Sequence, residues 1–285
     1  LILLDRNTVY NPSHFFGFFS TFNPDAIKDV RLYKGGYPAE YGGRLGSVLT
    51  IYNKDGNRNE TEGTATLGML ASRVSILGTR SHEGQARRST LEPVLAALRS
   101  TSDNIPSSFY FLDFNGKVNF DASKNDKLSL AFYSGQDKVN FPFSDDAEFK
   151  LNYGNRTLST NWTHIFSDKL FSNFVLTGSQ YFNYPEVELG GTPIERRNNI
   201  YDYSVKADLE YLPNEKHELA IGIWAGTLTI RLNDRFDDEP SFSSRSHSKY
   251  GSVYLSDTWR PSNKWKIVSG IRTSYLSDGD YFRLE

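Results

Sequence analysis

Residues 23–51, NPDAIKDVRLYKGGYPAEYGGRLGSVLTI, decide the interpretation of this chain. Five glycines and Pro38 separate two apolar runs, at residues 30–33 and 48–52. The start at Asn23-Pro24-Asp25 favours one helical turn over residues 26–29. Glycine pairs permit positive φ and proline removes a backbone donor, so residues 37–44 are expected to be irregular. The stretch therefore predicts a strand, a glycine-rich loop and a second strand.

Composition narrows the class of protein. The chain has 285 residues, enough for one or two domains with a substantial core. Its hydrophobic fraction is 38% and its mean hydropathy is -0.52, and no apolar run is long enough for a membrane-spanning helix. Alternating barrel strands would still be compatible with these values, because only every second residue would face lipid. A net charge of -2 disfavours nucleic acid as a partner, and the absence of cysteine mildly favours the cell envelope.

From Tyr110 onward the sequence alternates with period two over runs longer than ordinary strands. Such runs predict a sheet with one apolar and one polar face. The runs at residues 110–121 and 201–211 show this alternation position by position. Their apolar sets are Tyr110, Leu112, Phe114, Val118, Phe120 and Tyr201, Tyr203, Val205, Ala207, Leu209, Tyr211, and their polar sets are Asp113, Asn115, Lys117, Asn119, Asp121 and Asp202, Ser204, Lys206, Asp208, Glu210.

Polar segments of two lengths separate these runs. Short turns are expected at residues 123–127, 167–169, 213–216 and 261–264, and longer loops at residues 136–150, 184–199 and 233–248. Short turns on one rim and long loops on the other are typical of outer-membrane barrels. Tyrosine and tryptophan near strand ends predict interfacial girdles, at Tyr133, Trp162, Tyr181, Tyr184, Tyr211, Trp259, Trp265 and Tyr275. Residues 91–99 have helical spacing and predict one short helix.

The glycine-rich stretch resembles the end of the plug domain of TonB-dependent outer-membrane receptors, and residues 1–22 are similar to the preceding plug strand of their Bacteroidetes-type branch. Arg6-Asn7 departs from that branch, which often has glycine there. The resemblance implies an all-β fold, with the C-terminal part of a small α+β plug at residues 1–58 and the N-terminal part of a transmembrane antiparallel β-barrel, roughly ten strands, at residues 59–285. The chain would then be a fragment of a longer protein.

The resemblance also implies a function and partners. The protein would be a receptor for energised uptake of a scarce solute across the outer membrane of a Gram-negative bacterium. Its partners would be outer-membrane lipid and lipopolysaccharide, the inner-membrane TonB complex through a segment outside this chain, a small-molecule, oligosaccharide or peptide ligand, and a surface lipoprotein. The plug motif, and a reversible lock between plug and barrel, would use Lys34, Gly35, Gly36, Glu40, Tyr41, Gly42, Gly43 and Arg44. Expected wall partners for Glu40 and Arg44 are Lys117, Asp208, Glu210 or Arg272, and an ordinary local pair is the alternative.

Two other functions remain open. A barrel adhesin or surface receptor without transport would share the strands but has no use for residues 34–44. A soluble carbohydrate enzyme could hide paired carboxylates among the acidic residues, although the long runs argue against it. We expect no enzyme, no catalytic residues and no cofactor, since the five histidines are scattered and are expected on loops or strand surfaces. Acidic loops could take Ca²⁺, at Asp145, Asp146, Glu148, Asp234, Asp237, Asp238 and Glu239.

Overall fold

A computed structural model describes residues 1–285 apart from 15–16, 44–45, 58, 79–80, 102–104 and 145. The fold is all-β. The N-terminal segment, defined here as residues 1–57, contains β1 (Ile2–Leu4), β2 (Asn7–Thr8), β3 (Ser13–His14), β4 (Phe19–Ser20), β5 (Ile27–Tyr33), the 3₁₀ turn η2 (Ala39–Tyr41) and β6 (Val48–Asn53). The remainder contains β7 (Glu62–Thr66), β8 (Ala71–Gly78), β9 (His82–Ser89), α1 (Glu92–Arg99), β10 (Ser108–Asp121), β11 (Asp126–Ser144), β12 (Ala147–Ser167), β13 (Leu170–Leu189), β14 (Thr192–Asn214), β15 (His217–Phe236), β16 (Glu239–Ser262), β17 (Trp265–Leu276) and β18 (Tyr281–Leu284).

The N-terminal segment builds a four-stranded sheet in the order β2-β1-β6-β5. β1 and β6 are parallel, and β5 and β6 are the two strands expected around the glycine-rich loop. The helical turn expected at residues 26–29 is wrong, because β5 already begins at Ile27. The Asn23 side chain accepts a hydrogen bond from the Asp25 amide and closes a tight turn, and pairing of Ile27 with Asn53 then extends the chain.

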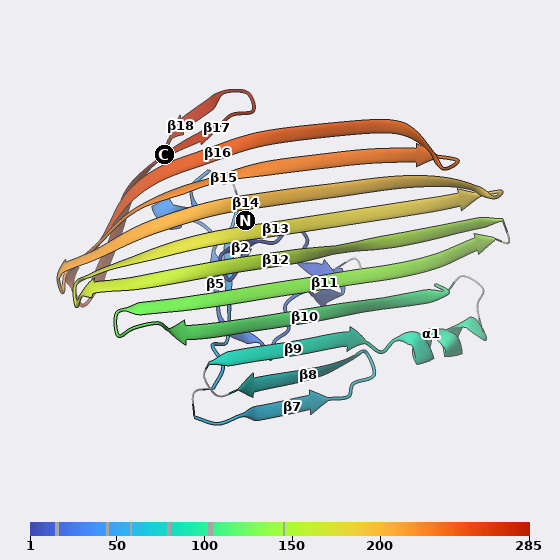
Figure 1. Cartoon of the computed structure of the whole chain (residues 1–285), viewed down its shortest axis with the longest axis horizontal. Helices are drawn as coiled ribbons and strands as arrows, with labels where there is room; N and C mark the ends of the chain where they lie inside the picture. Colours follow the sequence, from blue (N-terminus) through green and yellow to red (C-terminus); the bar gives the residue numbers. More distant parts are fainter. Residues whose placement is uncertain (15–16, 44–45, 58, 79–80, 102–104, 145) are drawn as a thin grey trace.

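The rest of the chain forms one antiparallel sheet, with twelve strands among the described residues, in sequential order from β7 to β18. Figure 1 shows these strands side by side, with the N-terminal segment behind them. Within the described residues β7 and β18 pair only with β8 and β17, so the sheet is open and no closed barrel is formed. The expected long antiparallel sheet is therefore present, with twelve strands instead of roughly ten.

The two faces of the large sheet reverse the usual arrangement of a soluble protein. We call the face against the N-terminal segment the inner face and the opposite one the outer face. On β10 the inner-face residues Asp113 and Lys117 are 1% and 9% exposed, whereas the outer-face residues Val118 and Phe120 are 51% and 62% exposed. β14 shows the same reversal, with Asp208 buried and Tyr203 exposed. The predicted alternation is confirmed, and the apolar rows lie bare.

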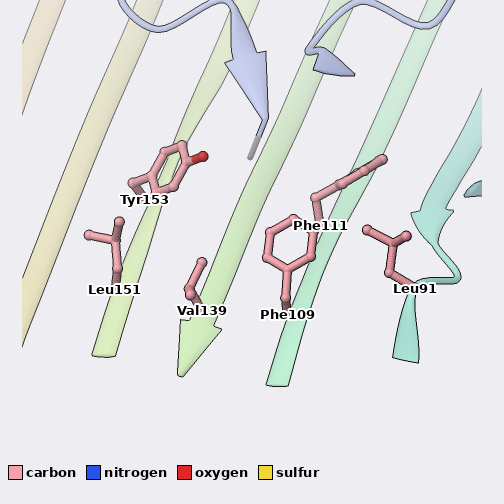
Figure 2. Close-up of a cluster of buried hydrophobic side chains, with 6 residues drawn as sticks. All are labelled: Leu91, Phe109, Phe111, Val139, Leu151 and Tyr153. Carbon is pink, nitrogen blue, oxygen red and sulfur yellow. The ribbon is translucent and has the colours of Figure 1, made fainter. Parts of the chain in front are cut away.

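Clusters of buried apolar side chains also lie on the inner face. One cluster combines Leu91 with side chains of β10, β11 and β12, and Figure 2 shows it: Leu91, Phe109, Phe111, Val139, Leu151 and Tyr153. A second cluster packs Leu4, Val9, Phe22 and Ile51 of the segment against Tyr133 of β11. Tyr133 is therefore buried against the segment, and its expected place in an interfacial girdle is wrong.

The expected short turns are confirmed, but the expected long loops at residues 136–150, 184–199 and 233–248 are mostly strand. β13 and β14 join through Gly190-Gly191, and β15 and β16 through Asp237-Asp238, with positive φ at all four positions. Paired positive φ angles are those of a two-residue hairpin turn. Polar side chains on both faces suggested loops, but a strand in water tolerates them because its ladder still satisfies the backbone.

The predicted helix is confirmed as α1 (Glu92–Arg99), with Pro93 in its first turn. Among the described residues no helix is long and apolar enough to cross a membrane. Trp162, Tyr211, Trp259 and Trp265 are exposed near the ends of their strands on the short-turn rim, as the girdle prediction requires.

If lipid covers the exposed apolar rows, a charged side chain on the outer face should lower the unfolding free energy most at the bilayer midplane and less near its interfaces. Leu176, in the middle of the apolar part of β13, is 49% exposed. We expect Leu176→Arg to lower the unfolding free energy in lipid vesicles by about 2–4 kcal/mol, the cost of arginine at a bilayer midplane. Ser172→Arg, four residues away on the same face and near the short-turn rim, is the control and should cost below about 1 kcal/mol. Equal effects of the two changes would show that acyl chains do not cover this face.

Candidate functional site

The candidate site is the contact between the N-terminal segment and the inner face of the large sheet. The glycine-rich module at residues 34–43 reaches this contact by a sharp return of the chain. Gly36 and Gly43 have φ angles of 59° and 76°, which favour glycine. A Cβ atom on Gly42 would lie 2.2 Å from the Arg272 side chain. The module therefore brings η2 against β16 and β17.

Glu40 of η2 ends a row of charges with alternating sign. It forms an ion pair with Lys206 of β14, whose Nζ lies 3.5 Å from Asp208 Oδ2. Arg6 Nη1 lies 3.3 Å from the same Asp208 oxygen. Burial raises the pKa of the Glu40 carboxyl, but the charge and hydrogen bond of Lys206 and the charge of Arg6 outweigh it and hold that pKa below its ordinary value. Glu40 is therefore ionised at neutral pH, and two loops of the segment are tied to one strand.

Arg272 of β17 holds the backbone of the same turn. Its Nη1 donates to the carbonyl oxygens of Ala39 at 3.0 Å and Glu40 at 2.8 Å. Its Nη2 and Nε donate to the hydroxyls of Ser252 and Ser274. The planar guanidinium thus joins η2 to two neighbouring strands, a geometry that lysine does not reproduce.

A second charged centre surrounds His14 of β3. His14 is 2% exposed, and its Nδ1 and Nε2 lie 2.5 Å from Asp137 Oδ2 and 2.7 Å from Asp113 Oδ1. Burial lowers the pKa of the imidazole, but the contacts and charges of Asp113 and Asp137 outweigh it and raise that pKa to about 9. Contact of both ring nitrogens with carboxylates favours the imidazolium form, so His14 is held as a cation between β10 and β11.

Arg87 of β9 completes this centre. Its Nε donates to Asp113 Oδ2 at 2.7 Å, and its Nη2 donates to the carbonyl oxygens of Ser20 and Thr21 at 2.7 and 3.2 Å. The Tyr133 hydroxyl donates to Asp113 Oδ1. Asp113 therefore receives donors from the segment and from two strands of the wall.

Lys117 of β10 forms a third contact. Its Nζ lies 2.7 Å from Asp55 Oδ1 and 3.6 Å from Asp5 Oδ1, and it donates to the Asn53 carbonyl at 3.1 Å. Burial raises the pKa of the Asp5 carboxyl, and Lys117 and Asn53 oppose this only in part. The end of β6 is thus fastened to the wall by a lysine that the alternation had placed on the polar face.

The structure separates the predicted site residues into groups. Glu40 and the buried Tyr41 face the wall, and the Gly43 amide donates to Glu285 Oε2 at 2.7 Å. Lys34, Gly35 and Gly36 are exposed. Arg44 lies outside the described residues, so its expected pairing stays a prediction.

The partner of Glu40 is Lys206, which was assigned to the polar face but not to the lock. Of the expected wall residues, Arg272 contacts the backbone of η2, while Lys117 and Asp208 contact Asp5 and Arg6. The His14 centre was missed altogether, and the expectation that His14 lies on a surface is wrong because it is buried. The role of Asp137 could not be predicted, because it falls in a stretch that was expected to be a loop.

Glu148 and Asp234, two of the acidic residues considered for Ca²⁺, have basic partners, and Asp145 lies outside the described residues. Glu148 pairs with Lys150, and Asp234 forms a two-point contact with Arg196. No group of three or more possible metal ligands occurs among the residues that the structure describes.

A cavity of about 560 Å³ lies beside this contact, between the segment and β14–β17. The hydroxyls of Tyr10 and Tyr250 both donate to Asp202 in its lining, at 2.8 and 2.7 Å. Trp224 and Arg272 line it as well. Aromatic walls with a few oriented polar groups are typical of small-molecule sites.

Comparison with known proteins identifies the fold. No protein-family model matches the chain, and no curated protein matches its sequence. Solved structures do match. The copper transporter OprC is 11% identical with a TM-score of 0.73, and the alignment covers 100% of this chain and 50% of OprC. The outer-membrane transporter YddB from Escherichia coli is 10% identical with a TM-score of 0.70 (99% and 49% coverage), and the unliganded ferric citrate transporter FecA is 12% identical with a TM-score of 0.67 (99% and 49%).

All three of these proteins are transporters. At such low identity the match establishes the fold alone: a long antiparallel sheet like that of outer-membrane transporters. The chain spans about half the length of the structures that it matches.

The raised pKa of His14 predicts that docking of the segment weakens with rising pH. Protonation of His14 stabilises the docked state fully below about pH 6.5 and ceases to do so as the pH rises through about 9. We expect the maleimide reaction of a cysteine at the buried position Thr21 to become faster as the pH rises between these two values, when its rate is divided by that of a cysteine at the exposed position Ser241. The ratio of the two rates removes the intrinsic pH dependence of thiol reactivity.

His14→Gln should abolish this pH dependence, and the exposed His247→Gln should preserve it. A pH dependence that persists in His14→Gln would show that another group controls the docking.

Proposed function

We propose that the protein is a TonB-dependent receptor of the Bacteroidetes-type branch, in the outer membrane of a Gram-negative bacterium, that takes up a scarce solute. Residues 1–58 would be the C-terminal part of the plug and residues 59–285 the N-terminal part of the barrel wall. One observation carries the proposal: the segment is held on a polar inner face by charged contacts, while the outer face of the same sheet is apolar and bare.

Charged contacts suit a segment that must move. Apolar burial is non-directional and gives way gradually, whereas a buried ion pair has two defined states because an unpaired buried charge is costly. Glu40–Lys206 and His14–Asp137 lie on strands at different parts of the wall. A pull on the segment would have to break both, which suits a gate that opens only under force.

The module at residues 34–44 would be the lock of this gate. Glu40 supplies the ion pair, Tyr41 the buried ring, and Gly42 and Gly43 the close approach to Arg272 and Glu285. Force would come from an inner-membrane TonB complex acting on a part of the protein outside this chain. Outer-membrane lipid, lipopolysaccharide and a surface lipoprotein would be the remaining partners.

The cargo would be a small molecule, an oligosaccharide or a peptide. The matched structures include transporters of copper and of ferric citrate. The cavity lined by Tyr10, Trp224 and Tyr250 borders the segment, so a ligand there would touch both the moving part and the wall. A non-transporting adhesin is the second candidate, and it would need no release of the segment.

Cross-linking tests the proposal directly, because the chain has no cysteine. We expect Glu40→Cys with Lys206→Cys, bridged by a cleavable bifunctional maleimide in the full-length protein, to abolish solute uptake by cells. Radiolabelled copper and ferric citrate are the first solutes to test, each with and without a protonophore. Cleavage of the linker should restore uptake.

The matched control bridges Asn233→Cys and Ser243→Cys, which face each other across β15 and β16 within the wall. This bridge should leave uptake unchanged. Uptake that continues with the segment fixed to β14, or that does not depend on energy, would overturn the proposed mechanism.

A further inference from the structure

The outer face changes character along the strands. On β16, Leu255 and Val253 are apolar, and the next outer-face side chains after Gly251 are Lys249, His247 and Arg245. On β12 the sequence of outer-face residues is Trp162, Thr160 and Leu158, followed by Arg156. The outer face thus changes from apolar to basic toward the strand ends that are joined by the two-residue hairpin turns.

The strand register gathers these cations. Arg231 of β15 lies directly opposite Arg245 of β16, and Thr229 and Thr227 lie opposite His247 and Lys249. All four basic side chains are exposed. Like charges directly opposite each other destabilise a sheet, so the pair of arginines costs stability unless an anion lies between them. We call Arg231, Arg245 and Lys249 the cationic patch.

The patch is not neutralised by the protein. Among the described residues, no carboxylate forms an ion pair with Arg231, Arg245 or Lys249, and the same holds for Arg156 of β12 and Lys138 of β11. Glu186 and Glu195 on the outer face are two or more rows further out and contact Lys150 and Arg197, and Asp280, between β17 and β18, contacts Tyr275.

Aromatic rings orient two of the guanidinium groups. Arg231 lies over the ring of Tyr201, with its Cζ 5.4 Å from the centroid, and Arg156 lies over Phe182 at 5.1 Å. A guanidinium stacked on a ring keeps its N–H donors in the plane, directed to the side. This arrangement presents forked donors to a tetrahedral anion.

At the other end of the strands the exposed lysines lie in the short turns, among them Lys216 and Lys264. The outer-face carboxylates of the strands at this end are next to histidines: Asp126 contacts His164 and Trp162, and Asp257 contacts His217. The row of strand cations opposite one another, Arg231 and Arg245, therefore lies on the hairpin side.

We propose that the cationic patch binds the phosphate groups of a phosphorylated lipid headgroup in the membrane leaflet on the hairpin side. Lys249 is four residues from Val253, about 13 Å along the strand, so the patch lies at headgroup depth when Val253 contacts acyl chains. Charge-assisted bonds from arginine forks to phosphate supply the recognition. The inference rests on the proposed membrane location but not on transport.

The test uses the full-length protein in a non-ionic maltoside detergent and a bis-phosphorylated glucosamine lipid (lipid A) as the probe. We expect Arg231→Gln with Arg245→Gln to weaken binding of this lipid at least tenfold, measured by native mass spectrometry. The control, Lys216→Gln with Lys264→Gln, removes the same charge from exposed positions at the opposite rim and should change binding less than twofold.

Three other probes separate the sources of affinity. The same lipid without its phosphates should bind at least tenfold more weakly to the unchanged protein. Phosphatidylglycerol and inorganic phosphate should both bind more weakly than lipid A. Inorganic phosphate binding as tightly as the lipid would overturn the proposal, as would equal loss in the two double variants.

Thermal unfolding tests whether the double arginine variant is correctly folded. Without anionic lipid, the double arginine variant should melt at or above the temperature of the unchanged protein, because a repulsive pair is removed. Addition of lipid A should raise the melting temperature of the unchanged protein only. A shift of equal size in the variant would contradict the proposal, and unchanged solute uptake by the variant would leave the transport proposal intact.

Discussion

The polar inner face of the large sheet is the constraint on which the rest of the structure depends. Asp113 and Lys117 of β10, Asp137 of β11 and Lys206 of β14 are buried on this face. Buried charges are stable only when paired, so the N-terminal segment has to supply complementary groups, and it does so with His14, Asp5, Asp55 and Glu40. The segment and the wall are therefore chemically matched surfaces.

The outer face follows from the same constraint. A strand has two faces, and when charge occupies the buried one, the apolar residues must lie on the other. In water those bare rows would favour aggregation, whereas in a bilayer they are satisfied. The same sheet thus accounts for the polar inner face and agrees with the proposed membrane location.

The faces of the strands and the position of the irregular loop could be predicted from particular residues. Alternation in residues 110–121 and 201–211 predicted the faces of β10 and β14, and the glycines and Pro38 predicted the irregular return between β5 and β6. Strand ends were harder, because polar residues beyond the apolar rows resemble loops although they pair as β-ladders. The His14 centre was not predictable, since Asp113 and Asp137 are 99 and more residues away in the chain.

The amino-acid sequence by itself determined which side chains share a face, because the two-residue period of a strand is a local property. It also determined that the chain can turn back at Gly36 and Gly43, since φ is a property of single residues. Only the tertiary structure decided which face is buried, which charges meet, and that Lys206 rather than Lys117 or Arg272 forms the ion pair with the Glu40 carboxylate. Those choices depend on the register of the strands and on the position of the segment across several of them, and both arise from contacts between distant parts of the chain.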